Sequence, residues 1–222
     1  MTAGLTQERR RPSPLALAAA VFGDQARLGC VEIRAAEMSG LHALEAARVE
    51  KAVPSRQREF AAGRQAARIA MAADLAVPMA TDRAPIWPAG ISGSITHAGG
   101  WALAVVSGSD RLIGIDLEVD EPLPMAVFET VLTPAERDWI RLQPDPAHWA
   151  RVIFCVKECA YKAQYPRSGQ LFGFEMFETA LDVKSGAFTA TFQATAAPFD
   201  KGDRLWGRFS RRDGFVLSGV LM

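Results

Sequence analysis

The chain has 222 residues, of which 49% are apolar, and its 25 basic and 25 acidic side chains cancel to a formal net charge of zero. This length and composition suit one large domain or two halves of about 100 residues each, and they argue against intrinsic disorder. A neutral chain also lacks the general positive charge expected of a protein that binds nucleic acid or an anionic membrane, so any basic surface must be local.

The cysteines are odd in number and widely spaced: Cys30, Cys155 and Cys159. This pattern fits neither a disulfide framework nor a zinc knuckle, and it favours a reducing compartment. The apolar runs of the sequence fall short of the roughly 18 residues that a transmembrane helix needs. We therefore expect a cytoplasmic protein with no membrane partner.

The N-terminal segment allows two interpretations. Three arginines, Arg9 to Arg11, precede a short apolar run that ends at Phe22, which is the outline of a signal peptide. Prolines interrupt the junction and the apolar run is short, so we favour a basic lead into a first helix or strand. Residues 1–14 are polar and rich in arginine and proline, and we expect them to be disordered.

Helices dominate the next part of the chain. Short helices are expected at 15–23 and 41–51, with an alternating strand between them at 30–34. A longer helix is predicted from Ser55 to Leu75, because Pro54 precedes it and Ser55 is a suitable cap.

Two faces of this long helix differ in character. A stripe of small and apolar residues at helical spacing should face the core: Phe60, Gly63, Ala67 and Met71. The other side carries four arginines: Arg56, Arg58, Arg64 and Arg68. Such a set is usually a solvated face, but guanidinium groups one turn apart can also form a fork for a phosphate.

A loop rich in proline and glycine is expected at 76–93, and it includes Arg83. The segment Gly93-Ser94-Ile95-Thr96-His97 follows, and a glycine pair leads from it into a strand at 101–106. A histidine at such a strand end is more often a local hydrogen-bonding residue than a ligand. Beside the hydroxyls of Ser94 and Thr96, however, His97 is also suited to phosphate binding.

The stretch 112–119 alternates strictly between apolar and other residues. On a strand, Ile113, Ile115 and Leu117 would face the core while Asp116 and Glu118 emerge together on the other face, roughly 7 Å apart. Like charges at this spacing are either solvated or share a cation, and magnesium is usually held by one or two carboxylates plus phosphate oxygens. The simpler alternative is an amphipathic strand with a solvated acidic face.

Two further helices are expected after this strand. The first begins with Thr133 as cap, Pro134 at the first position and Glu136 at the third, and it runs to about residue 142. The second spans about 147–165 and is closed by Pro166. It carries Lys157, Glu158 and Lys162, of which the last two form a pair one turn apart. Such a pair is commonplace on surfaces, but apolar neighbours here favour partial burial.

The C-terminal part reads as strands at 174–183, 187–192, 205–210 and 215–221, with Asp213-Gly214 as a hairpin turn. Each half of the chain thus contains a long helix and several strands. We expect an α+β protein made of a pair of similar subdomains, one at 15–112 and one at 113–222.

Taken together, several motifs resemble the ordered motifs of the 4'-phosphopantetheinyl transferases. They are Arg56 to Arg68, Trp87-Pro88, Gly93-Ser94-Ile95-Thr96-His97, Gly114-Ile115-Asp116-Leu117-Glu118 and Phe154 to Ala163. The resemblance covers about residues 55–175 and is strongest to the long, single-chain bacterial branch associated with siderophores and polyketides. Each motif alone is weak, but their order and spacing are specific.

This resemblance implies a pseudo-two-fold α+β fold with coenzyme A in the cleft between the halves. Family members transfer the phosphopantetheine arm of coenzyme A to a serine of an apo acyl, peptidyl or aryl carrier protein and release adenosine 3',5'-bisphosphate. The expected partners are therefore coenzyme A and a carrier protein, with no nucleic acid. A monomer is expected, because an internally duplicated chain would complete its own site.

The resemblance also implies roles for individual residues. Asp116, Glu118 and Glu158 would hold Mg²⁺, or Mn²⁺ in its place. Lys157 and Lys162 would meet the pyrophosphate. From the chemistry of the transfer, Glu158 is also the candidate base for the serine proton, either directly or through a metal-bound water. The residues expected to contact coenzyme A are Arg56, Arg64, Arg83, Thr96, His97, Asp116 and Lys162.

Two other classes of function use the same features. A magnesium-dependent phosphohydrolase or nuclease would need the acidic strand but no carrier protein. A non-catalytic module that binds coenzyme A would need the arginines and His97, but it would have no use for Asp116, Glu118 and Glu158 together.

Overall fold

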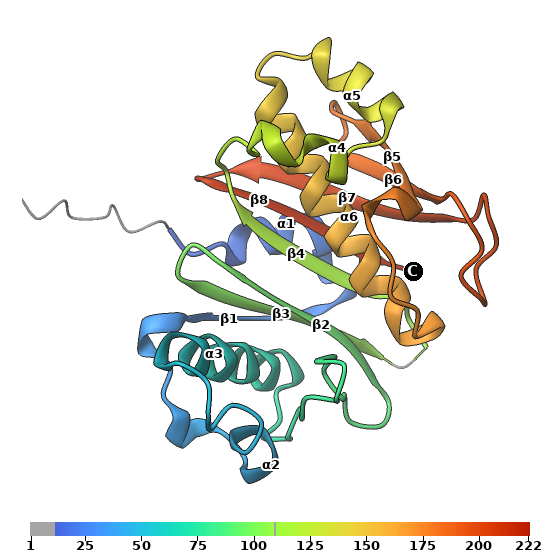
Figure 1. Cartoon of the computed structure of the whole chain (residues 1–222). Coiled ribbons are helices and arrows are strands. Elements are labelled where there is room, and N and C mark those ends of the chain that lie inside the picture. Colours follow the sequence, from blue (N-terminus) through green and yellow to red (C-terminus); the bar gives the residue numbers. More distant parts are fainter. Residues whose placement is uncertain (1–11, 109) are drawn as a thin grey trace, which may run out of the picture.

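The structure, a computed structural model, describes residues 12–108 and 110–222 and consists of two antiparallel sheets with helices packed on them (Figure 1). This confirms the predicted α+β class. Residues 1–14 are expected to be disordered, and of these, residues 1–11 lie outside the described residues.

The first sheet has three strands in the order β1 (Arg27–Glu32), β3 (Trp101–Gly108) and β2 (Ile91–Ala98). Helix α3 (Pro54–Met71) packs on it through the small and apolar stripe that the sequence predicts, because Phe60, Ala67 and Met71 are all buried.

The second sheet is larger, and its five strands follow one another in a different order from the sequence. They are β4 (Ile113–Val119), β8 (Phe215–Leu221), β7 (Arg204–Arg212), β6 (Ala187–Phe192) and β5 (Phe177–Asp182). Helix α6 (Pro146–Ser168) packs on one face of this sheet. The turn between β7 and β8 is the predicted hairpin, and both Asp213 and Gly214 have positive φ angles.

Helix α1 (Leu15–Phe22) joins the two sheets. Its apolar side chains form one core with Leu103 and Val105 of β3 and with the alternating face of β4, where Ile115 and Leu117 are fully buried. The apolar residues of β4 therefore face the core, as the alternating sequence predicts. The proposed boundary between two similar halves at residue 112 stays a prediction, and α1 contacts strands on both sides of it.

The remaining elements are short. They are the helices α2 (Ala43–Ala46), α4 (Phe128–Val131) and α5 (Pro134–Arg141) and the single turns η1 (Gly23–Gln25), η2 (Ile33–Ala35), η3 (Met38–Gly40), η4 (Met125–Val127) and η5 (Phe174–Met176). At the start of α5, Thr133 and Glu136 form the predicted capping box. Within the described part of the chain, no helix is long and apolar enough to cross a membrane.

Several predicted boundaries are wrong for local reasons. The helix expected at 41–51 is a single turn, α2, followed by turns. Helix α3 starts at Pro54, with Val53 rather than Ser55 at the cap position, because proline suits the first helical turn. Pro166 does not end α6, which continues to Ser168 and stops where Gly169 adopts a left-handed conformation.

Gly114 allows α6 to approach β4 closely. A Cβ atom at this position would lie 2.2 Å from the carbonyl oxygen of Cys159, which is backbone and cannot rotate away. The first position of the Gly114-Ile115-Asp116 motif therefore sets the distance between this strand and the helix that carries Lys162.

We predict that Gly114→Ala lowers the free energy of unfolding by about 1–3 kcal/mol, because the added methyl group overpacks the contact between β4 and α6. Urea denaturation followed by circular dichroism would measure this loss. Gly108→Ala is the matched control, since a Cβ there would meet no described atom within 4 Å. Equal stability of the two variants would contradict the prediction.

Candidate functional site

Strands β2 and β4 lie side by side but belong to different sheets. The hydroxyl of Ser94 accepts a hydrogen bond from the Ile115 N–H at 3.2 Å, and the hydroxyl of Thr96 accepts one from the Leu117 N–H at 3.1 Å. Side-chain oxygens of β2 thus accept hydrogen bonds from the backbone N–H groups along the edge of β4. We call this contact the hydroxyl seam.

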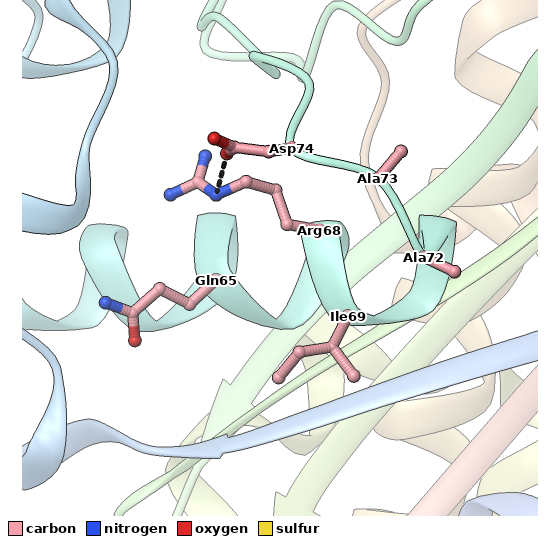
Figure 2. Close-up of a pocket in the computed structure, with 6 residues that line it drawn as sticks. All are labelled: Gln65, Arg68, Ile69, Ala72, Ala73 and Asp74. Carbon is pink, nitrogen blue, oxygen red and sulfur yellow. Dashed lines mark ion pairs between the residues drawn. The ribbon is translucent and has the colours of Figure 1, made fainter.

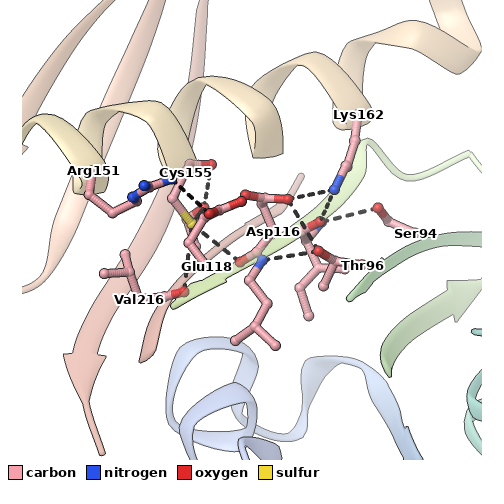
Figure 3. A network of polar contacts seen from close by, with 11 residues as sticks. Ser94, Thr96, Asp116, Glu118, Arg151, Cys155, Lys162 and Val216 are labelled. Carbon is pink, nitrogen blue, oxygen red and sulfur yellow. Dashed lines mark hydrogen bonds and ion pairs between the residues drawn. The ribbon is translucent and has the colours of Figure 1, made fainter. Parts of the chain in front are cut away.

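The hydroxyl seam also orients Asp116. Thr96 donates its own hydroxyl hydrogen to Asp116 Oδ1 at 3.2 Å (Figure 3). Lys162 Nζ approaches the same oxygen at 2.6 Å and lies 3.3 Å from the Ile115 carbonyl oxygen. Asp116 is only 3% exposed, and its second oxygen, Oδ2, is buried without a hydrogen-bond partner among the described residues. Thr96 and Lys162 therefore hold one oxygen of this carboxylate, and the other is a buried acceptor without a partner in the described part of the chain.

Glu118 turns toward a different cation. Its carboxylate lies 3.0 Å from Nη1 of Arg151, whose Nε donates to the Glu121 carbonyl oxygen (Figure 3). Burial, together with the nearby charge of Asp116, raises the pKa of Glu118 to about 7 even though Arg151 opposes the shift.

Glu158 is half-buried on α6, where the charges of Asp116 and Lys162 act on its carboxyl group. Burial raises the pKa of its carboxyl group, and the charge of Asp116 raises it further, against the effect of Lys162. Burial alone would lower the pKa of Lys162, but the charges of Asp116 and Glu158 leave it raised.

The expected metal site is not preformed. Across residues 12–108 and 110–222, no three His, Cys, Asp or Glu side chains gather in a group that could hold a metal ion. The physical reason is that Asp116 and Glu118 each face a cationic side chain, Lys162 and Arg151 respectively. The predicted ligands Asp116, Glu118 and Glu158 are neighbours that sense one another's charge, but in this structure they do not converge.

Lys157 lies apart from this group of charges. Its ammonium group is buried 2.7 Å from Glu136 and donates to the carbonyl oxygens of Val131 and Phe174. Burial lowers the pKa of Lys157, and Glu136 opposes the shift. The structure therefore does not bring this lysine to the same centre as Asp116 and Lys162.

A cavity of about 610 Å³ adjoins Lys162 and is lined by α3, the loop around residues 80–87, β2 and the C-terminal part of α6. It brings together six of the seven residues predicted to contact coenzyme A: Arg56, Arg64, Arg83, Thr96, His97 and Lys162. The seventh, Asp116, contacts this wall through Thr96 and Lys162.

One end of this cavity carries a polar group built from α3 and β2. Arg56 Nη1 lies 3.0 Å from His97 Nε2, and Glu59 contacts both side chains, at 3.3 Å from Arg56 and 3.6 Å from His97. All three are partly exposed. The arrangement leaves guanidinium and imidazole groups side by side at the surface of the cavity, which suits an anion.

Arg64 and Arg68 do not approach the same object, although they are one turn apart. Arg64 is 6% exposed and lies over the ring of Phe60, its Nε has no partner in the described part of the chain, and burial lowers its pKa to about 10. Arg68 instead pairs with the buried carboxylate of Glu45 at 3.0 Å, which also accepts from the Val77 N–H. The expectation of a solvated arginine face is wrong for these two residues.

Arg68 borders a separate, open depression of about 580 Å³ on the outer side of α3 (Figure 2). There its Nε lies 3.6 Å from Asp74, which is largely exposed. The described lining includes none of the residues predicted to be catalytic, to bind metal or to contact coenzyme A. We therefore place the functional site in the cavity beside Lys162.

Sequence reasoning does not identify four side chains that the structure adds to the site: Glu59, Asp82, Arg151 and Tyr165. Arg151 lies seven positions before Glu158 on the same face of α6, so helical periodicity could have indicated that it belongs near the site. Tyr165 donates to Asp82 at 2.6 Å across the rim of the cavity, and this hydrogen bond raises the pKa of the tyrosine to about 12. Nothing in the local sequence links residues so far apart.

We predict that Thr96→Val lowers the free energy of unfolding by about 1–3 kcal/mol, because it leaves the buried Leu117 N–H without its acceptor. Thr96→Ser keeps the hydroxyl and should recover most of this loss. Thermal or urea denaturation of both variants would measure the difference. A stable valine variant beside a destabilised serine variant would show that packing of the methyl group, rather than the hydroxyl seam, is responsible.

Sequence comparison assigns the two parts of this site to one family. Residues 44–107 match the 4'-phosphopantetheinyl transferase N-terminal domain, and residues 112–208 match the 4'-phosphopantetheinyl transferase superfamily. The first match contains the arginines and His97, and the second contains Asp116, Glu118, Glu158 and Lys162.

Individual relatives agree with this assignment. The chain is 33% identical over 195 residues to the 4'-phosphopantetheinyl transferase Npt of Nocardia iowensis, covering 81% of this chain and 88% of the relative. It is 38% identical over 190 residues to Svp of Streptomyces mobaraensis, with coverage of 79% and 76%. For PptT of Mycobacterium tuberculosis the identity is 35% over 192 residues, with coverage of 80% and 84%. The chain therefore belongs to the 4'-phosphopantetheinyl transferases, enzymes that transfer the phosphopantetheine group of coenzyme A to carrier proteins.

Proposed function

We propose that this transferase binds coenzyme A in the cavity lined by α3, β2 and α6 and uses Mg²⁺ to transfer the phosphopantetheine arm to a serine of an apo acyl, peptidyl or aryl carrier protein. The observation that carries this proposal is the position of Lys162. It lines the same cavity as Arg56 and His97 and also contacts Asp116. A ligand with two separate anionic groups could therefore place one of them beside Arg56 and His97 and the other beside Lys162.

Coenzyme A has this distribution of charge, with a 3'-phosphate on its ribose and a diphosphate farther along. We assign the 3'-phosphate to Arg56 and His97, whose side chains lie 3.0 Å apart at the cavity surface. Arg64 and Arg83 line the same cavity and add positive charge to it. Planar guanidinium groups suit phosphate because two parallel donors match two oxygens.

We assign the diphosphate to the region of Lys162 and Asp116. The chemistry of these side chains suits a magnesium ion, because carboxylate oxygens are its preferred protein ligands and the buried Oδ2 of Asp116 lacks a hydrogen-bond partner within the described residues. The ion would have to draw the three carboxylates together, since no such group is preformed in the described part of the chain. Glu118 and Glu158 are the other candidate ligands. Mg²⁺, or Mn²⁺ in its place, supplies charge neutralisation at the diphosphate when it is bound.

The reaction forms a bond between the serine oxygen of the carrier and the β-phosphorus of coenzyme A. The bond from that phosphorus to the oxygen of the α-phosphate breaks, and adenosine 3',5'-bisphosphate leaves. Glu158 is our candidate for the base that takes the serine proton, and Lys162 stabilises the negative charge on the leaving phosphate. Such a transfer depends mainly on positioning and charge neutralisation, which a cavity with fixed cations provides.

We further propose that the enzyme acts as a monomer in the cytoplasm. Support comes from the cavity, which residues of a single chain line on several sides. The free thiols of Cys30, Cys155 and Cys159 fit a reducing compartment.

We predict that an apo carrier protein incubated with the enzyme, Mg²⁺ and coenzyme A gains about 340 Da, the mass of the transferred arm. Intact-mass spectrometry of a panel of acyl, peptidyl and aryl carriers would measure this gain and identify the preferred class. EDTA should abolish the reaction, and Glu158→Gln should slow it at least about 100-fold. Glu129→Gln, a change of an exposed glutamate on α4, is the control. Release of inorganic phosphate without carrier modification would instead indicate a phosphohydrolase.

A second prediction tests the 3'-phosphate assignment. Arg56→Ala should raise the KM for coenzyme A by about 10- to 100-fold, the effect of losing a charged hydrogen bond. The same variant should leave the KM for dephospho-coenzyme A, which lacks the 3'-phosphate, nearly unchanged. Arg58→Ala is the matched control, because Arg58 is exposed on the same helix and does not line the cavity. An equal rise for both coenzymes would contradict the assignment.

A further inference from the structure

We propose that Lys157 is a positioning residue, whose buried ammonium group holds the segments around Val131 and Phe174 on α6 and so shapes the enzyme beside Glu158. This inference takes the transfer reaction as given and concerns only how the protein supports it. It assigns Lys157 a role away from the phosphates of coenzyme A, unlike Lys162 on the same helix.

The contacts of Lys157 are complete without a ligand. Its Nζ lies 2.7 Å from Glu136 Oε2, 2.8 Å from the Val131 carbonyl oxygen and 3.1 Å from the Phe174 carbonyl oxygen. An ammonium group has three hydrogens to donate, and these three acceptors account for all of them. The residue is 1% exposed, so a phosphate would have to displace protein atoms to reach it.

Glu136 is equally well satisfied. Its Oε2 accepts the Thr133 N–H at 2.8 Å, and its Oε1 accepts the N–H and the hydroxyl of Thr179 at 2.8 Å and 2.7 Å. The carboxylate that caps α5 therefore also binds β5 and the ammonium group from α6. We call Lys157, Glu136 and their hydrogen-bond partners the buried clamp.

The buried clamp joins five segments that are separate in the sequence: the end of α4, the start of α5, α6, η5 and β5. One of them, η5, borders a cavity of about 240 Å³ whose lining includes Glu158, Tyr161, Phe172 and Phe174. Lys157 thus holds one wall of this cavity at a fixed place relative to the candidate catalytic base.

The two lysines of α6 face different surroundings for a geometric reason. Five positions separate them, which places their side chains about 140° apart around the helix. Lys162 meets Asp116 and the larger cavity, whereas Lys157 meets Glu136 and the smaller cavity. Lys157 and Lys162 are close in one sequence motif, but their side chains therefore lie beside different cavities.

Removing one member of a buried ion pair leaves the other charge without compensation, whereas replacing both with neutral side chains does not. Lys157→Met keeps the length of the side chain but leaves Glu136 charged and buried. Adding Glu136→Gln removes this charge, but the single amide oxygen of glutamine can accept from Thr133 or from Thr179 and not from both. A double-mutant cycle at these positions therefore separates a clamp from a phosphate ligand.

The experiment compares Lys157→Met, Glu136→Gln, the double variant and Lys162→Met in the carrier assay, with the carrier that the wild type modifies fastest. We expect Lys157→Met to lower Tm by about 5–15 °C. Its kcat should fall about 10- to 100-fold, while its KM for coenzyme A stays within about threefold of the wild-type value. The double variant should recover part of the lost Tm, because no charge is left buried without a partner. Its kcat should stay low, because the carbonyl groups of Val131 and Phe174 still lack their donor. Lys162→Met should raise the KM for coenzyme A, because Lys162 lines the larger cavity. It should also lower Tm, because the buried carboxylate of Asp116 loses its cation, so the KM is the measurement that separates the two lysines.

Three results would overturn the proposal. A double variant that regains its Tm but keeps a KM for coenzyme A as high as that of Lys162→Met would show that Lys157 contacts the coenzyme. A double variant with the kcat of the wild type would show that the ammonium group is not needed to hold these segments. A Lys157→Met variant with the Tm and kcat of the wild type would show that the clamp has no effect. Failure of the wild type to modify any carrier would count against the transfer function and not against the clamp.

Discussion

The hydroxyl seam between β2 and β4 is the contact on which the site depends. It satisfies two buried N–H groups at the edge of the five-stranded sheet with side chains of the three-stranded sheet, through Ser94 and Thr96. A buried N–H without an acceptor costs about 1–3 kcal/mol, so these hydroxyls stabilise the junction of the two sheets. Because Thr96 also donates to Asp116, the same contact that joins the sheets orients a carboxylate of the candidate site.

Buried carboxylates in this protein are matched with cations, and the pairs serve different purposes. Glu45 with Arg68 and Glu136 with Lys157 lie inside the protein and join segments that are distant in sequence. The pair of Asp116 and Lys162 reaches the large cavity instead and leaves one carboxylate oxygen without a described partner. Burial and pairing alone therefore do not distinguish a site from a structural contact. The pair of Asp116 and Lys162 differs from the other two because Lys162 lines the large cavity and one oxygen of Asp116 has no partner among the described residues.

Helix α6 combines both purposes within a few turns. Gly114 lets it approach β4 closely, so that Lys162 reaches Asp116, while Lys157 on another face binds the segments around α5 and η5. Arg151 and Glu158, seven positions apart, share the face toward the acidic strand. A rigid helix held by one close backbone contact can thus present the proposed base Glu158, the lysine that we propose to bind phosphate and a partner for Glu118 in fixed relation to each other.

The sequence alone determined the features that arise from neighbouring residues. The alternation at 113–119 gave the buried face of β4, Thr133 and Glu136 gave the start of α5, and the ordered motifs indicated the family, because each depends on local periodicity or spacing. Only the tertiary structure decided which cation meets which carboxylate. Helical periodicity assigns Lys157 and Lys162, or Arg64 and Arg68, to faces, but it contains no information on what lies opposite. The partners Glu136 and Glu45 come from distant segments, and only the packing of the chain brings them there.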